Sequence, residues 1–398
     1  MIRKLIALLC FLVLLFPSAL AEEEVNFDVE DEVDITELVQ IAEETAAKEK
    51  KDSDGAYIMT VTCTGDFTIG DNHHRKKSFA SELKKHDGDI NFIMQNVRGL
   101  FLEDDLTIVN FEGTLTPDTT SAPKDKKNNE FLFSIDPQYV TVLPDNGVEA
   151  VSLDNNHVWD YGEQGLEDTK AALAGAGVLY STPTEPCTWT YKDQVEVVML
   201  SYNCIDRYGS GFKKEKFRRE YSESFLQYDT FEEAVCADIS AAKEVYPLVI
   251  VSFHWGIEKM YTPTENQTRL GRMAVSAGAD LVIGNHSHRF QPVEHYTDEE
   301  GHEGFICYSL GNFCFAGNDK PSDMTSILFQ IRYRVKDGNV SYKDYRVIPI
   351  RISSKKDANN FIPMILEDEY SRDSVLSVLR ENSKVLPYAV TDFPLTFQ

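Results

Sequence analysis

The chain has 398 residues, of which 42% are hydrophobic, so it can bury the core of one large domain or of two small ones. Its formal net charge is −26. Because nucleic acid is bound through a basic footprint, this charge argues against a nucleic-acid partner. A polyanionic substrate would also be repelled at long range, unless metal ions or a local basic patch reverse the field near the site.

The first 21 residues have the pattern of a signal peptide. Arg3 and Lys4 supply the positive start, Leu5 to Phe16 form an apolar run of 12 residues, and Ala19 and Ala21 frame a cleavage site. An apolar run of this length is too short to span a bilayer comfortably, so we favour cleavage. The alternative is an uncleaved membrane anchor. We therefore expect a secreted protein, or one on the extracytoplasmic cell surface.

Composition divides the rest of the chain into three parts. Residues 22–55 are predicted to be a solvated acidic linker, since residues 22–50 hold 12 acidic side chains and two lysines. Residues 56–353 are predicted to form the folded domain, and residues 354–398 a peripheral C-terminal tail with one helix near Ser371–Asn382.

Six of the seven cysteines follow residue 21, an even number that permits disulfides in an exported protein. Cys63 and Cys204, however, lie in apolar runs that are typical of buried free thiols.

Apolar strands alternate with helical stretches along most of this domain. Strands rich in Val, Ile and Leu are predicted at Tyr57–Thr64, Leu106–Phe111, Glu149–Leu153, Glu196–Tyr202, Leu248–Phe253 and Asp280–Ile283. Helices are predicted at Ser78–His86, Pro137–Leu143, Glu163–Ala174, Thr230–Glu244 and Glu265–Ala277. This alternation predicts an α/β fold with largely buried sheets. Later strands without helices between them predict an antiparallel addition or a second sheet; they are Gly304–Tyr308, Thr325–Tyr333 and Val340–Ile350.

Polar side chains follow five of the predicted strands, at the point where each strand ends. They are Asp66, Glu112, Asn156, His157, His254, His286 and His288. In open α/β sheets, ligands bind beyond the carboxyl ends of the strands, so these residues point to one shared pocket. Each motif alone is weak, because Gly-Asp and Asn-Asn-His are common in turns. The ordered set of five is specific, since chance would rarely place all of them after buried strands.

The chemistry of these side chains predicts a metal site. Carboxylate, amide carbonyl and imidazole ligands together suit Mn, Fe or Zn better than Ca or Mg. One carboxylate can also bridge two cations about 3.5–4 Å apart, the spacing of two-metal hydrolytic sites. We predict one or two divalent ions, with the ligands Asp66, Glu112, Asn156, His254, His286 and His288.

The same motifs resemble those of the CapA/PgsA-type capsule synthesis proteins, which are linked to poly-γ-glutamate and are similar to calcineurin-like metallophosphoesterases. The matching stretches are Gly65–Gly70, Asn110–Glu112, Asn155–His157, Asp160–Gly162, His254–Glu258, Ala277–Gly284, His286, His288 and Ser309–Phe313. The resemblance covers about residues 57–350 and implies a four-layer sandwich of two mixed β-sheets flanked by helices. It also implies a role in making, anchoring or trimming an extracellular anionic polymer, with membrane-bound capsule synthase subunits as possible partners.

The sequence departs from the metallophosphoesterase pattern at several positions near this site. Thr68 stands where a metal-binding His is usual, and Glu112 stands where an Asp usually bridges the metals. Asn285 and Ser287 replace a commoner His and Pro. Asp154 replaces a small residue, and it could add a carboxylate to the site or cap a helix. These departures favour one tightly bound and one weakly bound metal.

The resemblance implies a mechanism in which Glu112 joins two metal positions. Asn156, His254 and His286 would hold one metal with Glu112, and Asp66 and His288 would hold the other. Asp66 and His157 are the predicted catalytic residues. His157 would protonate the leaving group or stabilise developing charge, and a structural hydrogen bond is its alternative role.

Two functions remain open at this point. The first is metal-dependent hydrolysis or transfer on an anionic polymer of the poly-γ-glutamate type or on a phosphoester. The second is a non-catalytic subunit that holds the polymer or a synthase partner. The absent ligand at Thr68 favours the second function, and the three histidines favour the first.

Overall fold

The computed structural model describes residues 51–74, 78–121, 131–205 and 221–397, which lie within one compact unit, Lys50–Gln398. The predicted signal peptide, 1–21, and most of the predicted acidic linker lie outside the described residues. Within the described ranges, no helix has both the length and the apolar character that crossing a bilayer requires.

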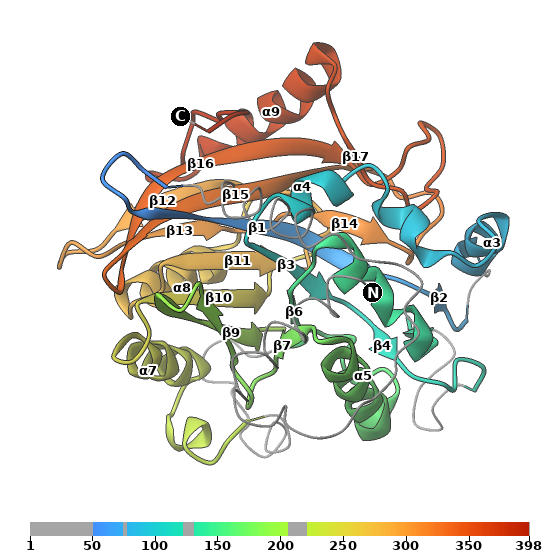
Figure 1. Ribbon diagram of the computed structural model, residues 1–398, viewed down its shortest axis with the longest axis horizontal. Helices are drawn as coiled ribbons and strands as arrows, with labels where there is room; N and C mark the ends of the chain where they lie inside the picture. Colours follow the sequence, from blue (N-terminus) through green and yellow to red (C-terminus); the bar gives the residue numbers. More distant parts are fainter. Residues whose placement is uncertain (1–50, 75–77, 122–130, 206–220, 398) are drawn as a thin grey trace, which may run out of the picture. The chain divides into compact units, whose positions relative to one another are not determined.

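The larger of two main sheets has eight strands in the order β17-β16-β15-β1-β3-β6-β7, with β14 also paired to β1 (Figure 1). Its strands are β1 (Tyr57–Thr68), β3 (Leu106–Phe111), β6 (Ala150–Ser152), β7 (Leu179–Ser181), β14 (Asn312–Phe315), β15 (Thr325–Lys336), β16 (Asn339–Arg351) and β17 (Met364–Ile365). Strand β1 runs parallel to β3 and β14 but antiparallel to β15, so the sheet is mixed.

The second sheet has six strands in the order β12-β13-β11-β10-β9-β8. They are β8 (Cys187–Tyr191), β9 (Val195–Asn203), β10 (Leu248–His254), β11 (Leu281–Asn285), β12 (Val293–Thr297) and β13 (Glu303–Cys307). The four central strands are parallel and the two edge strands are antiparallel. A small third sheet is formed by β2 (Asp71–Asn72), β4 (Thr114–Leu115) and β5 (Phe133–Ile135).

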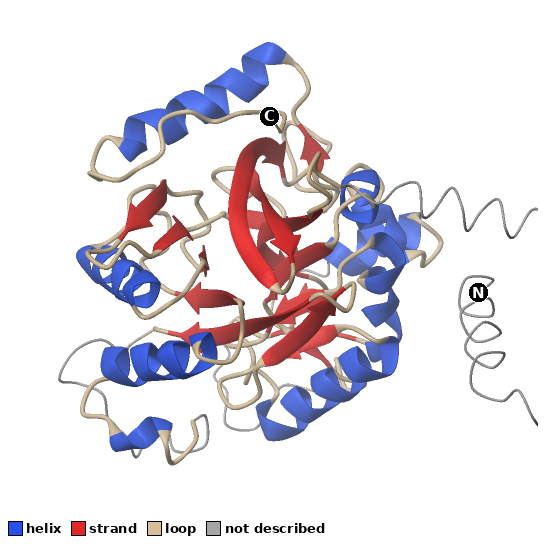
Figure 2. Ribbon diagram, turned by 60° about the vertical axis from the view of Figure 1, so that its left-hand side comes forward, coloured by secondary structure: helices blue, strands red, loops and turns tan. Residues whose placement is uncertain are grey.

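Three apolar clusters define the layers. One cluster lies between the main sheets and joins residues such as Val61 and Ile108 of the larger sheet to Ile250 and Ile283 of the smaller one. A second cluster packs helices against the outer face of the larger sheet, and a third packs helices against the outer face of the smaller sheet. The order is therefore helix, sheet, sheet, helix (Figures 1 and 2), which confirms the predicted four-layer α/β fold.

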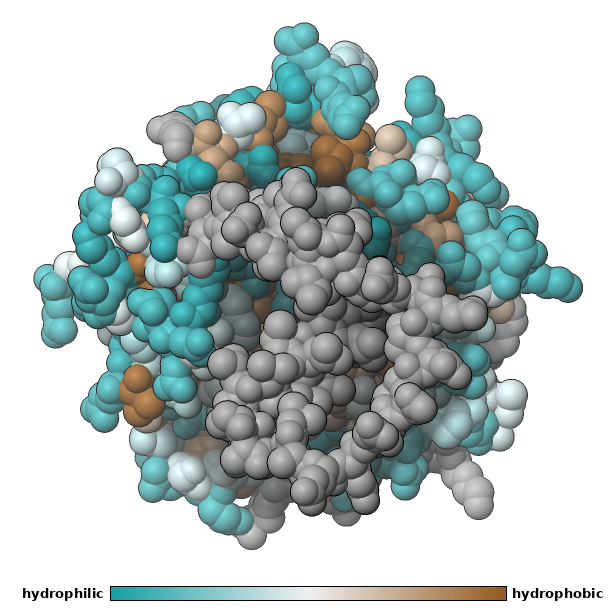
Figure 3. All heavy atoms as spheres, viewed as in Figure 1, coloured by the Kyte–Doolittle hydropathy of each residue, from teal (hydrophilic) through white to brown (hydrophobic). Residues whose placement is uncertain are grey.

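The helices of the outer layers come from both halves of the chain. The larger sheet is covered by α3 (Ser78–Lys85), α4 (Arg98–Leu102), α5 (Gly162–Ala176) and the 3₁₀ helices η1 (Ile90–Met94), η2 (Pro137–Val142) and η3 (Pro144–Asn146). The smaller sheet is covered by η5 (Phe225–Gln227), α7 (Phe231–Lys243) and α8 (Glu265–Ser276). In the coloured part of the face drawn in Figure 3, hydrophilic side chains dominate and hydrophobic ones are scattered.

All nine predicted strands are present, but one predicted helix differs in type. The Pro137–Leu143 segment forms the 3₁₀ helix η2, whose first turn begins at Pro137 with the Asp136 side chain accepting the Gln138 N–H. Pro144 follows directly, and proline cannot donate the backbone hydrogen bond that a continuing α-helix needs. The six cysteines of the described part are all free thiols, so none of them forms a disulfide.

The C-terminal segment 354–398, predicted as a peripheral tail, contains the expected helix, α9 (Glu369–Ser383). Four of its buried side chains, Val375, Leu376, Leu379 and Phe393, belong to the cluster that also lies between the sheets. This segment therefore contributes to the main core, and the domain boundaries drawn from the sequence stay a prediction.

Candidate metal centre

The predicted site residues lie together at the carboxyl ends of strands from both main sheets. Asp66 is on β1, opposite Asn110 of the parallel strand β3, and Glu112 directly follows β3. His254 ends β10 opposite Asn285 of β11, and His286 and His288 follow β11. Because the two sheets pack face to face, the strand ends that carry these polar side chains lie next to each other at one edge of the sandwich.

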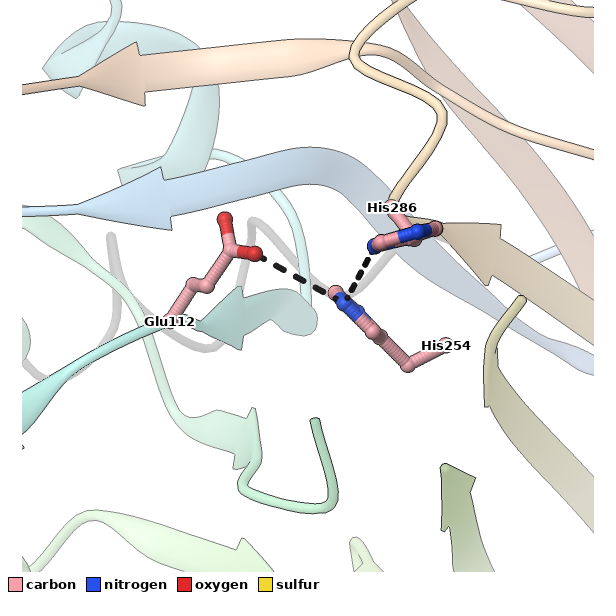
Figure 4. A group of neighbouring side chains, drawn as sticks. All are labelled: Glu112, His254 and His286. Atoms are coloured by element: carbon pink, nitrogen blue, oxygen red, sulfur yellow. Dashed lines mark hydrogen bonds and ion pairs between the residues drawn. The ribbon is translucent and has the colours of Figure 1, made fainter. Parts of the chain in front are cut away.

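The first donor group is centred on His254. Its Nε2 atom lies 2.7 Å from Asn156 Oδ1, 3.1 Å from His286 Nδ1 and 3.6 Å from Glu112 Oε1. Figure 4 shows Glu112, His254 and His286 pointing toward one another from the ends of β3 and β10 and from the turn after β11. All three side chains are buried, and their donor atoms are close enough together to hold one metal ion.

The second donor group consists of Asp66, Glu112 and His288. Asp66 Oδ2 lies 3.1 Å from His288 Nδ1, and Glu112 belongs to both groups. The structure thus brings together all six predicted ligands in the predicted division, with Glu112 between the two positions. That these residues bind metal stays a prediction.

The turn that carries two of the histidines is strained. His286 and His288 have φ angles of 91° and 52°, in a region that non-glycine residues rarely adopt. The preceding Gly284 has no room for a side chain, because a Cβ atom there would lie 2.1 Å from the Tyr308 carbonyl oxygen. Such strain costs about 1–3 kcal/mol per residue and clusters at functional sites. The strained turn separates the two imidazoles, so that each joins a different donor group.

Hydrogen bonds orient the two carboxylates. Asp66 Oδ1 accepts N–H groups from the Asn110 side chain at 2.9 Å and from the His286 backbone at 3.3 Å. The Thr68 hydroxyl donates to Glu112 Oε2 at 3.2 Å. The other two oxygens are also buried, and each faces an imidazole: Asp66 Oδ2 lies 3.1 Å from His288 Nδ1, and Glu112 Oε1 lies 3.6 Å from His254 Nε2, within the described part of the chain and without a well-aligned hydrogen bond.

Buried oxygens of this kind are costly unless a partner satisfies them, and a cation would do so at both carboxylates. The donor atoms are carboxylate and amide oxygens with imidazole nitrogens, a set that suits Mn, Fe or Zn. The residues present therefore fit a divalent metal ion.

Burial and neighbouring charges shift the pKa values of these groups. Burial, and then the charge of Asp66, raise the pKa of Glu112. Burial, and then the charge of His288, lower the pKa of His286 to about 4, so that its imidazole is neutral at pH 7. Burial also disfavours a charged His288, but Asp66 and Glu112 outweigh this effect and raise its pKa to about 9.

His157 lies beside these donor groups and is held by a carboxylate. Its Nδ1 atom lies 2.8 Å from Asp160 Oδ2, which also accepts the Phe133 backbone N–H at 2.8 Å. Burial lowers the pKa of His157, but Asp160 outweighs burial and raises it. His157, Asp160, Glu112, Asn156 and His288 all line one pocket of about 420 Å³. His157 thus makes a structural hydrogen bond and also faces the pocket.

Other residues near the site have roles that the sequence left open or did not assign. Asp154 is in neither donor group found among the described residues; its Oδ2 accepts the Asn203 N–H at 2.7 Å, which ties the end of β6 to the end of β9. Asn110 and Asn312 contact the predicted ligands Asp66 and His288. Both asparagines lie in motifs quoted above, Asn110–Glu112 and Ser309–Phe313. Their place in these motifs was the only feature of the sequence that pointed to them.

Comparison with known proteins places the chain in a family. The family described as "Bacterial capsule synthesis protein PGA_cap" matches residues 60–317. The chain belongs to the bacterial capsule synthesis protein family. This membership confirms the resemblance stated from the sequence motifs.

Two relatives and one solved structure illustrate the similarity. The PGA biosynthesis protein CapA of Bacillus subtilis (strain 168) is 28% identical over 347 residues, which cover 85% of this chain and 82% of the relative. The capsule biosynthesis protein CapA of Bacillus anthracis is 27% identical, over 74% of this chain and 67% of the relative. The calcineurin-like phosphoesterase YfkN from Bacillus subtilis has a TM-score of 0.38 at 15% identity, covering 83% of this chain and 98% of that structure.

Proposed function

We propose that this member of the capsule synthesis family is an exported, metal-dependent hydrolase or transferase. Its substrate would be an extracellular anionic polymer of the poly-γ-glutamate type or a phosphoester. The observation that carries this proposal is the pair of buried donor groups that share Glu112. A divalent ion held there would act as a Lewis acid and would lower the pKa of a bound water.

The chain's own residues have distinct tasks in this proposal. The Asn110 side chain holds Asp66 at Oδ1, so that Oδ2 faces His288 and the second donor group. His157 is fixed at Nδ1 by Asp160, so Nε2 is the atom left to deliver a proton to a leaving group in the pocket. Since Asp160 keeps the pKa of His157 raised, the imidazole holds that proton nearer to neutral pH.

The pocket offers contacts for an anionic chain despite the acidic body. Lys259 and Arg289 line it, together with the aromatic side chains Phe131, Phe133 and Phe315. Arg289 is buried and donates to the His288 carbonyl oxygen at 2.6 Å, which fixes a positive charge beside the donor groups. Glu112, Asp160 and Glu258 line the same pocket, so these two cations alone do not reverse its field, and bound metal ions would have to supply the remaining positive charge that an anionic substrate requires.

A second function is favoured by one specific observation. Thr68 offers no nitrogen ligand, and its hydroxyl hydrogen-bonds to Glu112 instead. A site that holds one ion weakly would suit a non-catalytic subunit that binds the polymer or a membrane-bound synthase subunit.

Metal analysis followed by turnover assays separates these functions. The purified mature chain would be assayed on a phosphodiester and on poly-γ-glutamate, beside His254→Ala and His157→Ala variants. Hydrolysis that needs metal and is lost in both variants supports the enzyme. Bound metal without turnover, together with metal-dependent retention of the polymer, supports the subunit. A chain that binds no metal contradicts both readings of the site.

Export has its own test. The full-length chain would be expressed in a Gram-positive host and its amino terminus sequenced. Release of a chain that begins at Glu22 supports cleavage of the predicted signal peptide. A chain that keeps Met1 and sediments with membranes supports the anchored alternative.

A further inference from the structure

The two donor groups are unequal in the number of ligands assigned to them. The first group has Glu112, Asn156, His254 and His286, whereas the second has Asp66, Glu112 and His288. Thr68, at the position of the missing ligand, directs its hydroxyl to Glu112. The second position therefore needs a further donor from elsewhere in the chain to match the first.

Strand β14 brings Asn312 to this position. It pairs in parallel with β1, and Asn312 lies opposite Asp66 in the register. The turn before it is fixed closely to β1, because the Asp66 N–H donates to the Gly311 carbonyl oxygen at 2.8 Å. This approach requires glycine at position 65, where a Cβ atom would lie 2.0 Å from that same oxygen.

The Asn312 side chain points at the second donor group. Its Oδ1 atom lies 2.9 Å from His288 Nδ1, the same nitrogen that lies 3.1 Å from Asp66 Oδ2. Asn312 is 4% exposed, and it lines the pocket together with Glu112 and His288. The His288 nitrogen therefore lies within 3.1 Å of both an amide oxygen and a carboxylate oxygen.

This arrangement repeats that of the first donor group. There, Asn156 Oδ1 lies 2.7 Å from His254 Nε2, which lies 3.1 Å from His286 Nδ1. Two donors that each lie 2.0–2.2 Å from a cation are about 2.8–3.6 Å apart at angles between a right angle and the tetrahedral angle. The spacings in the second group lie within this range, and in the first group only the Asn156–His254 distance of 2.7 Å is slightly shorter.

From this repetition we infer that Asn312 Oδ1 is the fourth protein ligand of the second metal position, equivalent to Asn156 in the first. This inference rests on the proposed metal site. It means that the second position consists of Asp66, Glu112, His288 and Asn312, and that the amide from β14 stands in for the ligand absent at Thr68.

The test measures metal binding rather than activity. Calorimetric titration with Mn²⁺ and metal analysis would compare the wild-type chain with Asn312→Ala, Asn312→Asp and Asn318→Ala. Asn318 is the matched control, because it lines the same pocket but is exposed and its Oδ1 accepts the Lys320 N–H. We expect Asn312→Ala to weaken one site by roughly 100-fold or more, beyond the 10–100-fold typical of outer-shell changes. The Mn²⁺ affinity of the other site and the circular dichroism spectrum should stay unchanged in Asn312→Ala. Asn318→Ala should bind Mn²⁺ as the wild type does, and Asn312→Asp should restore binding.

A double-mutant cycle distinguishes a ligand from a residue that only positions His288. If Asn312 is a ligand, Asn312→Ala weakens the second site further in a His288→Ala background. If it acts only through His288, the double variant binds as His288→Ala does, and the inference is overturned. Unchanged Mn²⁺ affinity in Asn312→Ala also overturns it while leaving the proposed metal site intact. A wild-type chain that binds no divalent ion would instead end the proposed function, and the inference with it.

Discussion

Replacing Glu112 with Gln tests the metal centre at the residue that both donor groups share. The substitution keeps the shape of a side chain that is 1% exposed, and it removes the charge and one ligand oxygen. Glu112 Oε1 has no hydrogen-bond partner in the described part of the chain, and burial raises the pKa of its carboxyl. Without metal, the variant should therefore be at least as stable as the wild type at pH 8, since a buried charge is removed.

With metal, the order of stability should reverse. Metal at 100 times its Kd stabilises the folded state by about 2.7 kcal/mol. If the lost ligand weakens binding about 100-fold, the same metal concentration gives the variant only about 0.4 kcal/mol. The compact unit of about 350 residues, Lys50–Gln398, has an unfolding entropy of roughly 0.7 kcal/mol/K at its Tm. Metal should therefore raise the Tm of the wild type by about 4 °C and that of Glu112→Gln by less than 1 °C.

Differential scanning calorimetry with and without Mn²⁺ or Zn²⁺ measures this difference. Glu258→Gln is the matched control, because Glu258 lines the same pocket and belongs to neither donor group found among the described residues. Its metal-dependent rise in Tm should equal that of the wild type. An equal rise in Glu112→Gln, with full metal content, would refute the shared-ligand geometry.

Three further predictions concern groups around the centre and away from it. Asp160→Asn should lower kcat by 10²-fold or more, measured on a substrate that the wild type hydrolyses, with little change in metal content. The pH profile of kcat should also shift to lower pH, because Asp160 raises the pKa of His157. Burial raises the pKa of Asp104 to about 8, against hydrogen bonds from Thr107 and Thr62. Between about pH 4 and pH 8 the folded state therefore holds a proton that the unfolded chain has lost, so stability falls as pH rises across this range and levels off above about pH 8. Asp104→Asn should flatten this fall in thermal scans between pH 6 and 9. Leu379→Ala should lower the free energy of unfolding in urea by about 2–5 kcal/mol, since Leu379 of α9 is fully buried. A loss below about 0.5 kcal/mol would show that α9 is a peripheral tail that does not stabilise the core.

The sequence predicted the central strands and the proximity of the candidate site residues, because both follow from patterns that can be read along the chain. Strands such as Leu248–His254 are buried throughout, and their runs of Val, Ile and Leu mark them without tertiary information. Polar residues at the ends of several parallel strands must share one edge of the sheet, so His254 and His286 could be placed together from sequence order alone. The structure brings them within 3.1 Å.

The elements that were not predicted are short or depend on distant partners. Strand β14 has four residues, and it is defined by pairing with β1, which lies far away in the sequence. Strand β8 alternates buried and exposed residues over only five positions, too few for a period-2 pattern to stand out. The role of Asn312 depends on β14, so no spacing in the sequence could assign it. For Pro137–Val142, apolar spacing indicates a helix but cannot distinguish the 3₁₀ from the α form.

The shared carboxylate has a consequence for how two ions would bind. Thr68 holds Glu112 Oε2, and Oε1 points toward His254. An ion in the first group would fix Oε1, and with it the orientation of the oxygen offered to the second group. An ion that binds the second group must also displace a proton from His288. Asp66 and Glu112 raise the pKa of His288 to about 9, so its imidazole keeps this proton at pH 7, whereas His286 is already neutral at that pH. Metal binding to protonated ligands releases protons and strengthens with pH. The two positions should therefore fill in order, the His254 group first and the His288 group second. The second step should release the proton of His288, so the difference in affinity between the two positions should narrow as pH rises toward 9.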